Sequence, residues 1–167
     1  MISEIVIIIY AIVLIIFLFL WFVWPWVHGG SLWTPTPSKT VKQALELCEL
    51  KEDDVFYDLG SGFGHTLAEA SKICDNVTGI EIEPIKYYVS KLNARKAKII
   101  LGNFFKANLS DATVVFVFQY KGRINNNIRK KLEGELKTGA RVVSYWWEIE
   151  GWQYEKYVNN LFLYIKK

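Results

Sequence analysis

The 167-residue chain has little of the chemistry that metal centres and disulfide scaffolds need. It contains two cysteines, two histidines and one methionine. Cys48 and Cys74 lack the spacing of a zinc motif, and two cysteines are too few for a disulfide framework. We therefore expect no metal site, and we expect both cysteines to be small buried core residues. Apolar residues make up 51% of the chain, which excludes an intrinsically disordered protein.

Charge is nearly absent from the first 30 residues, where Glu4 is the one charged side chain. At about 1.5 Å per residue, the uncharged run Ile5–Val27 is long enough to cross a hydrocarbon core of about 30 Å. A cleaved signal peptide would begin with basic residues and end in small ones, whereas this run follows an acid and ends in Trp24-Pro25-Trp26-Val27. The sequence predicts a permanent transmembrane helix with tryptophans at the membrane interface.

Positive charge gathers later in the chain. The range Lys86–Lys131 contains eleven Lys or Arg residues and one acid, Asp111. Such a range is typical of a solvated surface, or of contact with anionic lipid or an acidic macromolecule. Lys39 and Lys42 follow the apolar run, and no Lys or Arg precedes it, so the positive-inside tendency places the rest of the chain in the cytoplasm.

Glycine and proline separate the apolar run from the remainder. Gly29, Gly30 and two prolines break helical structure before residue 38. Thr40 with Gln43 three residues later is typical of a capping box and predicts a helix over about 39–50. We divide the chain into an anchor at 1–28, a linker and pre-domain helix at 29–50, and a folded domain at 51–167.

The folded domain alternates short apolar runs with helical stretches. The expected helices cover about 64–74, 84–94 and 123–136. Strands that alternate with helices predict an α/β fold with a mostly parallel sheet and right-handed crossovers. The expected parallel strands are Val55–Leu59, Val77–Ile82, Lys98–Leu101, Thr113–Phe118 and Arg141–Trp146.

The C-terminal segment breaks this alternation. Two strand-like runs, Trp152–Val158 and Leu161–Ile165, are separated by the pair Asn159-Asn160. Two asparagines between apolar runs are typical of a tight hairpin turn. We therefore expect an antiparallel hairpin at one edge of the sheet.

A glycine-rich turn follows the first expected strand, with the sequence Asp58-Leu59-Gly60-Ser61-Gly62-Phe63-Gly64-His65. Glycines let the backbone approach a ligand, and the following helix start offers unpaired amides to an anion. Asp58 can accept a hydrogen bond from a ligand amine, and Glu81 at the next strand end is placed to bind ribose hydroxyls. The alternative is a tight turn that serves helix–sheet packing alone.

The spacing of the glycines discriminates between cofactors. A dinucleotide fingerprint, GxGxxG, would need glycine where the chain has His65, and no Lys-Ser/Thr pair follows to make a nucleotide P-loop. The observed GxGxG after a strand ending in Asp resembles motif I of class I S-adenosylmethionine-dependent methyltransferases. This resemblance implies a Rossmann-like sheet and S-adenosyl-L-methionine as cofactor. It implies a cofactor site made of Thr36, Asp58, Gly60, Ser61, Gly62, Gly64, Glu81, Asn103 and Phe104.

Further segments resemble the archaeal protein-lysine methyltransferases, which are related to membrane-anchored mitochondrial lysine methyltransferases. Those segments are Thr34-Pro35-Thr36-Pro37, Tyr57-Asp58-Leu59-Gly60, Gly102-Asn103-Phe104-Phe105, the run 109–115 (LSDATVV) and the run 135–144 (ELKTGARVVS). The chain departs from that family at Phe63, where an acid is common, at His65, where Arg is usual, and at Tyr145, which replaces His.

The family resemblance implies a membrane-anchored N-methyltransferase that acts on lysine side chains of proteins. Residues after the fourth and fifth strands are the candidates for the mouth where the methyl group is transferred: Gln119, Tyr120, Trp146, Trp147 and Glu148. Gln119 is suited to orient the amine, and Glu148 to accept a proton through water. Core or edge packing is the alternative role of the tryptophans.

Two other functions remain open at this stage. The chain could methylate a lipid or a small amine, or it could be a non-catalytic membrane module that retains the fold. A nucleic-acid substrate is disfavoured, because no Asx-Pro-Pro-aromatic motif follows the fourth strand and no Pro-Cys nucleophile is present.

Overall fold

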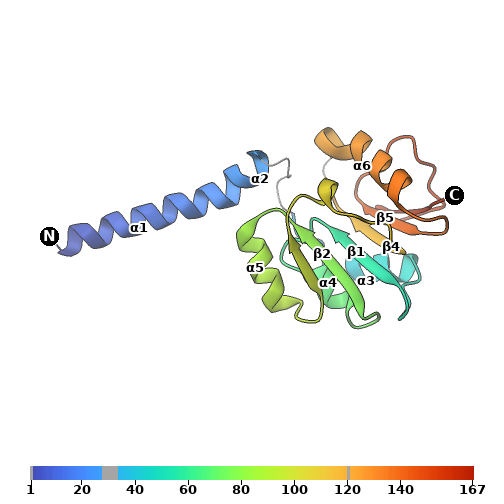
Figure 1. Ribbon diagram of the computed structural model, residues 1–167, viewed down its shortest axis with the longest axis horizontal. Helices are drawn as coiled ribbons and strands as arrows, with labels where there is room; N and C mark the ends of the chain where they lie inside the picture. The colour runs from blue at the N-terminus through green and yellow to red at the C-terminus, as the bar shows by residue number, and fades with distance from the viewer. Residues whose placement is uncertain (1, 28–33, 120) are drawn as a thin grey trace.

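A single mixed sheet organises the domain in the computed structural model, which describes residues 2–27, 34–119 and 121–167 (Figure 1). Within these residues seven strands pair in the order β3-β2-β1-β4-β5-β7-β6. The strands from β3 to β5 are parallel, whereas β7 is antiparallel to both β5 and β6. The strands are β1 (Val55–Leu59), β2 (Asn76–Glu81), β3 (Lys98–Leu101), β4 (Val114–Val117), β5 (Arg141–Tyr145), β6 (Lys156–Val158) and β7 (Leu161–Ile165).

This arrangement confirms the predicted α/β sheet with its antiparallel C-terminal hairpin. Asn159 and Asn160 have φ angles of 50° and 63°, as a two-residue hairpin turn requires. The hairpin is shorter than expected, because β6 begins at Lys156 rather than Trp152. Trp152 lies in a turn before β6 instead, where its amide donates a hydrogen bond to the carbonyl of Ile149.

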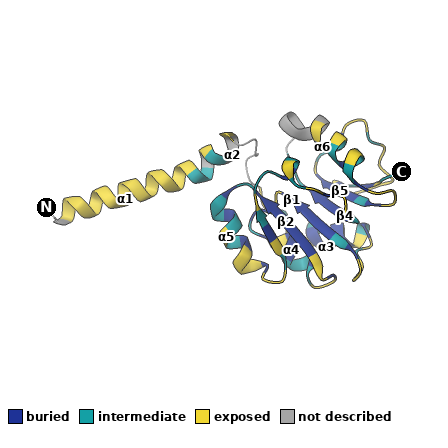
Figure 2. Cartoon of the chain, viewed as in Figure 1, coloured by how far each residue is buried: buried dark blue, intermediate teal, exposed yellow. Residues whose placement is uncertain are grey.

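Helices cover both faces of the sheet and create two apolar cores. The described helices of the domain are α3 (Ser38–Leu47), α4 (His65–Ala70), α5 (Pro84–Asn93) and α6 (Lys121–Glu135). One core packs Val41 of α3 and Leu67 of α4 against Phe56 of β1. The other packs Ile128 and Leu132 of α6 on the opposite face. The central strands are accordingly buried, as Figure 2 shows in dark blue.

The start of α3 corrects the predicted capping box. Pro37 is the N-cap, and its carbonyl accepts the Val41 amide at 3.0 Å, so Thr40 lies inside the helix. The fixed φ of proline lets the helix begin three residues earlier than a cap at Thr40 would place it. The helix also ends early, at Leu47, because Glu49 adopts a left-handed conformation and the Leu50 amide bonds back to Leu45.

The N-terminal segment is helical throughout its described part but changes its winding. The α-helix α1 (Ile2–Leu18) passes into a π-helical turn, η1 (Phe19–Val23), and then into α2 (Trp24–Val27). Pro25 has no amide to donate, and the Trp24 amide bonds the carbonyl of Phe19 five residues back. Within the described residues one helix, Ser3–Trp21, is long and apolar enough to cross a membrane. Most residues of this helix are exposed, and Figure 2 therefore draws it mainly in yellow.

A polar network closes the edge of the sheet where the parallel strands begin. The Asp54 carboxylate accepts hydrogen bonds from the Lys51 amide at 2.7 Å, from the Thr113 hydroxyl at 2.6 Å and from the Arg141 guanidinium. Arg141 also donates to the carbonyls of Cys48 and Glu49. The network therefore joins the end of α3 to the starts of β1, β4 and β5.

The Asp54 network predicts a pH-dependent contribution to stability. Burial opposes ionisation of Asp54, but the hydrogen bonds from Thr113, Lys51 and Arg141 outweigh it and hold its pKa below the ordinary value. The stabilisation that Asp54 gives to the folded state is therefore complete above its pKa in the unfolded chain, which is about 4. This stabilisation is lost as the pH falls through the lower pKa of Asp54 in the folded chain. Asp54→Asn should lower the free energy of unfolding by about 2–4 kcal/mol at pH 7, because it leaves Arg141 without its buried partner.

Thermal and denaturant unfolding of the full chain in detergent, at pH 7 and pH 3, measures this difference. The exposed neighbour Asp53 provides the matched control, Asp53→Asn, which should change stability by less than about 0.5 kcal/mol. Equal effects of the two substitutions would contradict the assignment.

Candidate functional site

The carboxyl ends of β1 and β4 form the point where the strand order reverses. From β1 the chain proceeds outward through β2 and β3, and it then crosses to the other side of β1 to form β4. In open parallel sheets, ligands bind in the crevice beyond the carboxyl ends of the strands at such a reversal. The glycine-rich turn follows β1 at this place.

Three glycines give the turn its shape. Gly60, Gly62 and Gly64 have φ angles of 90°, 54° and 83°, a backbone region that other residues adopt at a cost. The amides of Gly60 and Ser61 both donate to the carbonyl of Ile80, at 2.9 and 3.1 Å. The turn is thereby held against the end of β2, and Gly64 leads directly into α4.

The Glu81 carboxylate connects this turn to the next one. Its Oε2 accepts the Gly62 amide at 2.7 Å, and its Oε1 accepts the Glu83 amide at 2.9 Å. Glu81 is buried, and burial raises its pKa although the two amides stabilise the charged form. Each carboxylate oxygen has more than one lone pair, so Glu81 can accept further donors from a ligand.

Asp58 lies beside Glu81 on the neighbouring strand. Its side chain is buried, and burial together with the negative charge of Glu81 raises the pKa of Asp58 to about 8, against a hydrogen bond from Thr66. Two adjacent buried acids favour a ligand that brings a cation or hydroxyl donors to them. S-adenosylmethionine carries both an ammonium group and ribose hydroxyls, so these residues fit the cofactor that the motif implies.

A third strand end completes the same edge. The Gly102 amide donates to the Glu81 carbonyl at 2.8 Å, which holds the exit of β3 against the exit of β2. Asn103 follows, and its Oδ1 accepts the Phe105 amide at 2.9 Å and caps the short 3-10 helix η2 (Phe104–Lys106). Phe104 is buried beside this cap. The residues expected around the adenine therefore lie next to the residue expected to hold the ribose.

On the opposite side of the glycine turn, Gln119 follows β4. Its Nε2 donates to the Leu59 carbonyl at 2.9 Å. A Cβ added at Gly60 would overlap that amide, so the two residues are in direct contact and Gly60 admits the Gln119 side chain. Tyr120, the neighbouring candidate, lies outside the described residues.

The remaining predicted residues do not all lie at the glycine turn, of which Ser61 is a part. Trp147 and the exposed Glu148 follow β5, on the far side of β4 from the glycine turn, and the Trp147 carbonyl accepts the Ser144 hydroxyl. Thr36 lies in the extended segment before α3. The Ser61 hydroxyl is buried close to Gly79 of β2, where a Cβ would come within 2.8 Å of it.

The end of the N-terminal helix also reaches the site, which sequence reasoning did not anticipate. The Trp24 indole donates to the Ile82 carbonyl at 2.9 Å, directly after Glu81. The Trp21 ring lies 5.9 Å from the ring of Phe63, between the second and third glycines of the turn. Lys86 of α5 is buried, and its Nζ lies 5.2 Å from the centre of the Trp21 ring. The sequence signal was the tryptophan content of this segment, which the expected membrane interface already explained.

Comparison with known proteins points to one enzyme class. Residues 58–156 match the family described as ANTKMT methyltransferase domain. A protein-lysine N-methyltransferase of Saccharolobus islandicus is 39% identical over 128 residues, which cover 72% of this chain and 79% of the relative. A 23S rRNA (uracil(1939)-C(5))-methyltransferase of Legionella pneumophila is 32% identical over 102 residues, which cover 61% of this chain and 22% of that protein.

Solved structures agree with this comparison. An RNA methyltransferase from Salinibacter ruber in complex with S-adenosyl-L-homocysteine superposes with a TM-score of 0.72 at 30% identity. The superposition covers 80% of this chain and 92% of that one. A precorrin 8w decarboxylase from Methanobacterium thermoautotrophicum shares the fold at 21% identity and a TM-score of 0.59, over 66% of this chain and 63% of that one.

The Glu81 geometry predicts a loss of cofactor affinity on substitution. Glu81→Gln keeps the shape but removes the charge and sets an NH₂ group against one backbone amide. It should weaken S-adenosylhomocysteine binding by about 1–3 kcal/mol, because charge-assisted hydrogen bonds are lost. Calorimetry on the full chain in detergent measures the affinity. Glu52→Gln, in the exposed turn before β1, is the control and should bind like the original chain; an unchanged affinity of Glu81→Gln would remove Glu81 from the site.

Proposed function

The chain belongs to the ANTKMT methyltransferase domain family and is an S-adenosylmethionine-dependent methyltransferase, and we propose that its substrates are lysine side chains of proteins. The observation that carries the substrate class is the 39% identity to a protein-lysine N-methyltransferase over 79% of that relative. The family profile spans both strand ends that hold Asp58 and Glu81.

Transfer to a lysine imposes a condition that the surroundings of the site can meet. When bound, S-adenosylmethionine supplies an electrophilic methyl group, and the accepting amine must be neutral although a free lysine has a pKa near 10.4. Apolar surroundings lower the pKa of an amine. Phe118, the residue before Gln119, begins a continuous aromatic row with Tyr145 and Trp146, in which successive ring centres lie 4.7 and 5.8 Å apart. Trp146 is 53% exposed, so this row reaches the surface.

Within this proposal Gln119 has the clearest role. Its hydrogen bond to Leu59 fixes the side-chain amide at the end of β1, next to the glycine turn. A fixed amide there is suited to orient the incoming amine for in-line attack. Glu148 is the candidate to accept the released proton through water, and Tyr120 and Trp147 remain candidates for the wall of the mouth.

The RNA-directed relatives raise the rival of a nucleic-acid substrate. Methylation at C5 of a pyrimidine needs a nucleophilic thiolate to activate the ring. Cys48 and Cys74 are both buried, as predicted, and burial raises their pKa values to about 12 and about 11. Cys48 ends α3 and Cys74 precedes β2, so both lie at the sheet edge opposite the site. These thiols do not support that chemistry.

The N-terminal helix is proposed as a membrane anchor. Its length and apolar composition support a span, and the following lysines favour a cytoplasmic position of the catalytic domain. The division into an anchor at 1–28, a linker and helix at 29–50 and a methyltransferase domain at 51–167 stays a prediction. An anchored enzyme of this kind is expected to act on proteins in or near the membrane, whereas a lipid or a small amine is the alternative substrate.

Labelling with tritiated cofactor separates the substrate classes. The full chain in detergent is incubated with membranes, soluble proteins and RNA isolated from cells. The labelled material is then hydrolysed, and the labelled product is identified by chromatography. We expect the label in methylated lysine of membrane-associated proteins, and we expect it to vanish with Glu81→Gln at low cofactor concentration. Label confined to lipid or RNA would contradict the proposed substrate class.

A second prediction concerns Gln119. Gln119→Ala should lower the rate of methyl transfer at least about tenfold, or ~1.4 kcal/mol, because it acts on the reacting amine. Its affinity for S-adenosylhomocysteine should stay within about threefold, because cofactor contacts lie mostly elsewhere. Gln153→Ala, in an exposed loop, serves as the control. Equal losses of rate and affinity would place Gln119 in the cofactor pocket instead.

A further inference from the structure

The end of the N-terminal helix is tied to the domain at a defined place. Trp24 donates to the Ile82 carbonyl, and Trp21 contacts both Phe63 and Lys86. The segment Ser3–Trp21 contains 19 residues, which at about 1.5 Å per residue approach the ~30 Å of a hydrocarbon core. If that segment spans the membrane, Trp21 lies at the membrane surface, where tryptophan is favoured. The residues that touch Trp21 then lie at the same level.

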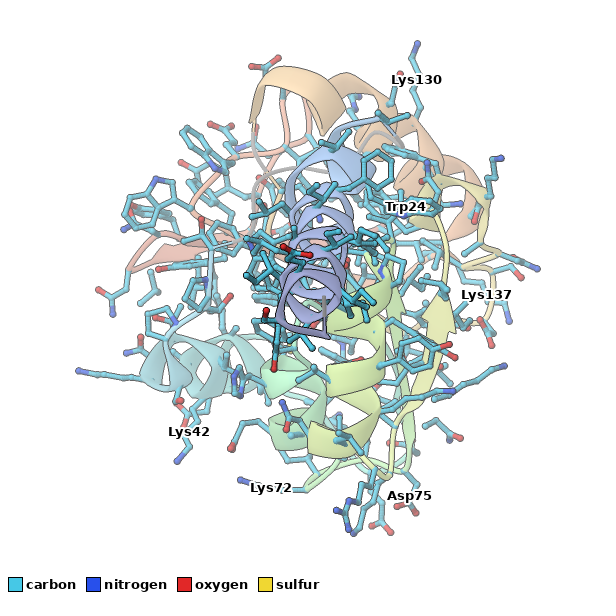
Figure 3. The ribbon with its side chains drawn as sticks, turned by 90° about the vertical axis from the view of Figure 1, so that its left-hand side faces the viewer. Trp24, Lys42, Lys72, Asp75, Lys130 and Lys137 are labelled. Atoms are coloured by element: carbon cyan, nitrogen blue, oxygen red, sulfur yellow. The ribbon has the colours of Figure 1, made fainter. Side chains whose placement is uncertain are left out.

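Helix α5 begins at the level of Trp21, and therefore at the proposed membrane surface. Lys86, in its first turn, is the residue that contacts the Trp21 ring. In Figure 1, α5 runs down the side of the domain from which α1 emerges, across the direction of α1. Figure 3 looks toward this side, so that α1 is seen end-on with α5 directly beside it. A membrane crossed by α1 would therefore face the outer surface of α5.

That outer surface has the composition of an interfacial helix. The exposed residues Tyr88, Lys91 and Leu92 follow at spacings of three and four that place them on one helix face, and the exposed Arg95 follows two residues after the helix ends at Asn93. Tyr88 is 64% exposed and Leu92 is 66% exposed, although both are large and apolar. Helices that lie in the plane of a membrane combine such apolar residues with Lys and Arg.

The charge around α5 favours one kind of partner. No acidic residue occurs between residues 84 and 110, whereas Lys96 and Lys98 add exposed positive charge after the helix. Lys72 is paired with Glu69 at 2.6 Å, and the acidic Asp75 lies on the same lower outline in Figure 3, so the uncompensated positive charge is that of α5 and the segment after it. A basic helix surface that is held near a bilayer is complementary to anionic lipid headgroups. A second copy of this chain would instead bring the same positive charge against it.

We infer that the outer face of α5, formed by Tyr88, Lys91 and Leu92, lies on the surface of the membrane together with Arg95 after the helix and binds anionic headgroups. This inference rests on the membrane anchor proposed above. It adds a second membrane contact that fixes the rotation of the domain, so that the carboxyl edge of the sheet keeps a constant position relative to the bilayer.

Depth-dependent fluorescence quenching tests this contact in the full chain. An environment-sensitive dye is placed at Lys96→Cys, after α5, and in a second sample at Lys156→Cys, on β6 at the opposite edge of the sheet. The buried Cys48 and Cys74 define the background in the unsubstituted chain. In vesicles of phosphatidylcholine and phosphatidylglycerol that contain brominated lipids, quenching at residue 96 should be at least about threefold that at residue 156.

Two paired substitutions identify the surface. Tyr88→Glu with Leu92→Glu should reduce quenching at residue 96 to near the level of residue 156. The matched pair Tyr157→Glu with Val158→Glu, at the other edge, should leave it unchanged. High salt should weaken the quenching, because it screens the attraction of the basic residues to the headgroups. Retained S-adenosylhomocysteine binding confirms that each variant is folded.

Extraction at alkaline pH separates the two ways in which the inference can fail. A chain that stays in the membrane but shows equal quenching at residues 96 and 156 would overturn the α5 contact and leave the anchor standing. A chain that is extracted would overturn the anchor, and the α5 contact with it. Energy transfer between dyes at residue 96 of different copies, without quenching by lipid, would assign this face to self-association instead.

Discussion

The Glu81 carboxylate accepts hydrogen bonds from the amides of Gly62 and Glu83, and this pair of bonds joins the two turns from which the site is built. One turn carries the glycines after β1, and the other leads into α5. Because β3 is tied to the Glu81 carbonyl through Gly102, a third strand end depends on the same residue. The cost of burying this acid beside Asp58 is reflected in the raised pKa values of both. Acids with pKa values shifted in this way are common at functional sites.

Much of this architecture could be predicted from the sequence. The bounds of β1, β3 and β7 agree with the prediction, because each is a short and mostly apolar run, although β3 lies at the edge of the sheet with Lys98 and Leu101 exposed. The pair Asn159-Asn160 predicted the turn between β6 and β7, because few other residues adopt positive φ angles at two successive positions. The glycine turn was predictable because its positive φ angles restrict the residue types that can occupy it, and Glu81 because an acid at the end of the second strand is suited to hold a ribose. Their binding of the cofactor stays a prediction. The start of α3 was missed, since proline geometry prevailed over the polar residues that resemble a cap.

Contacts between distant segments could not be predicted in the same way. The Trp24–Ile82 hydrogen bond joins residues 58 positions apart, and no sequence pattern indicates that these two residues meet. The tryptophans of the N-terminal segment already had an explanation as interfacial residues, so nothing in the pattern called for a second one. Lys86 was counted only as part of a basic range, whereas the structure buries it near the Trp21 ring and the acids Glu81 and Glu83. The proposed anchor is consequently in direct contact with the two turns of the candidate site.

A crystal structure of the full chain with S-adenosyl-L-homocysteine tests the central role of Glu81 most directly. The account predicts ribose hydroxyls within hydrogen-bond distance of the Glu81 carboxylate while the amides of Gly62 and Glu83 stay bound to it. It also predicts the amino-acid end of the ligand at the glycine turn, near Asp58. A ligand whose ribose does not touch Glu81, or which lies away from the carboxyl ends of β1 and β2, would contradict it.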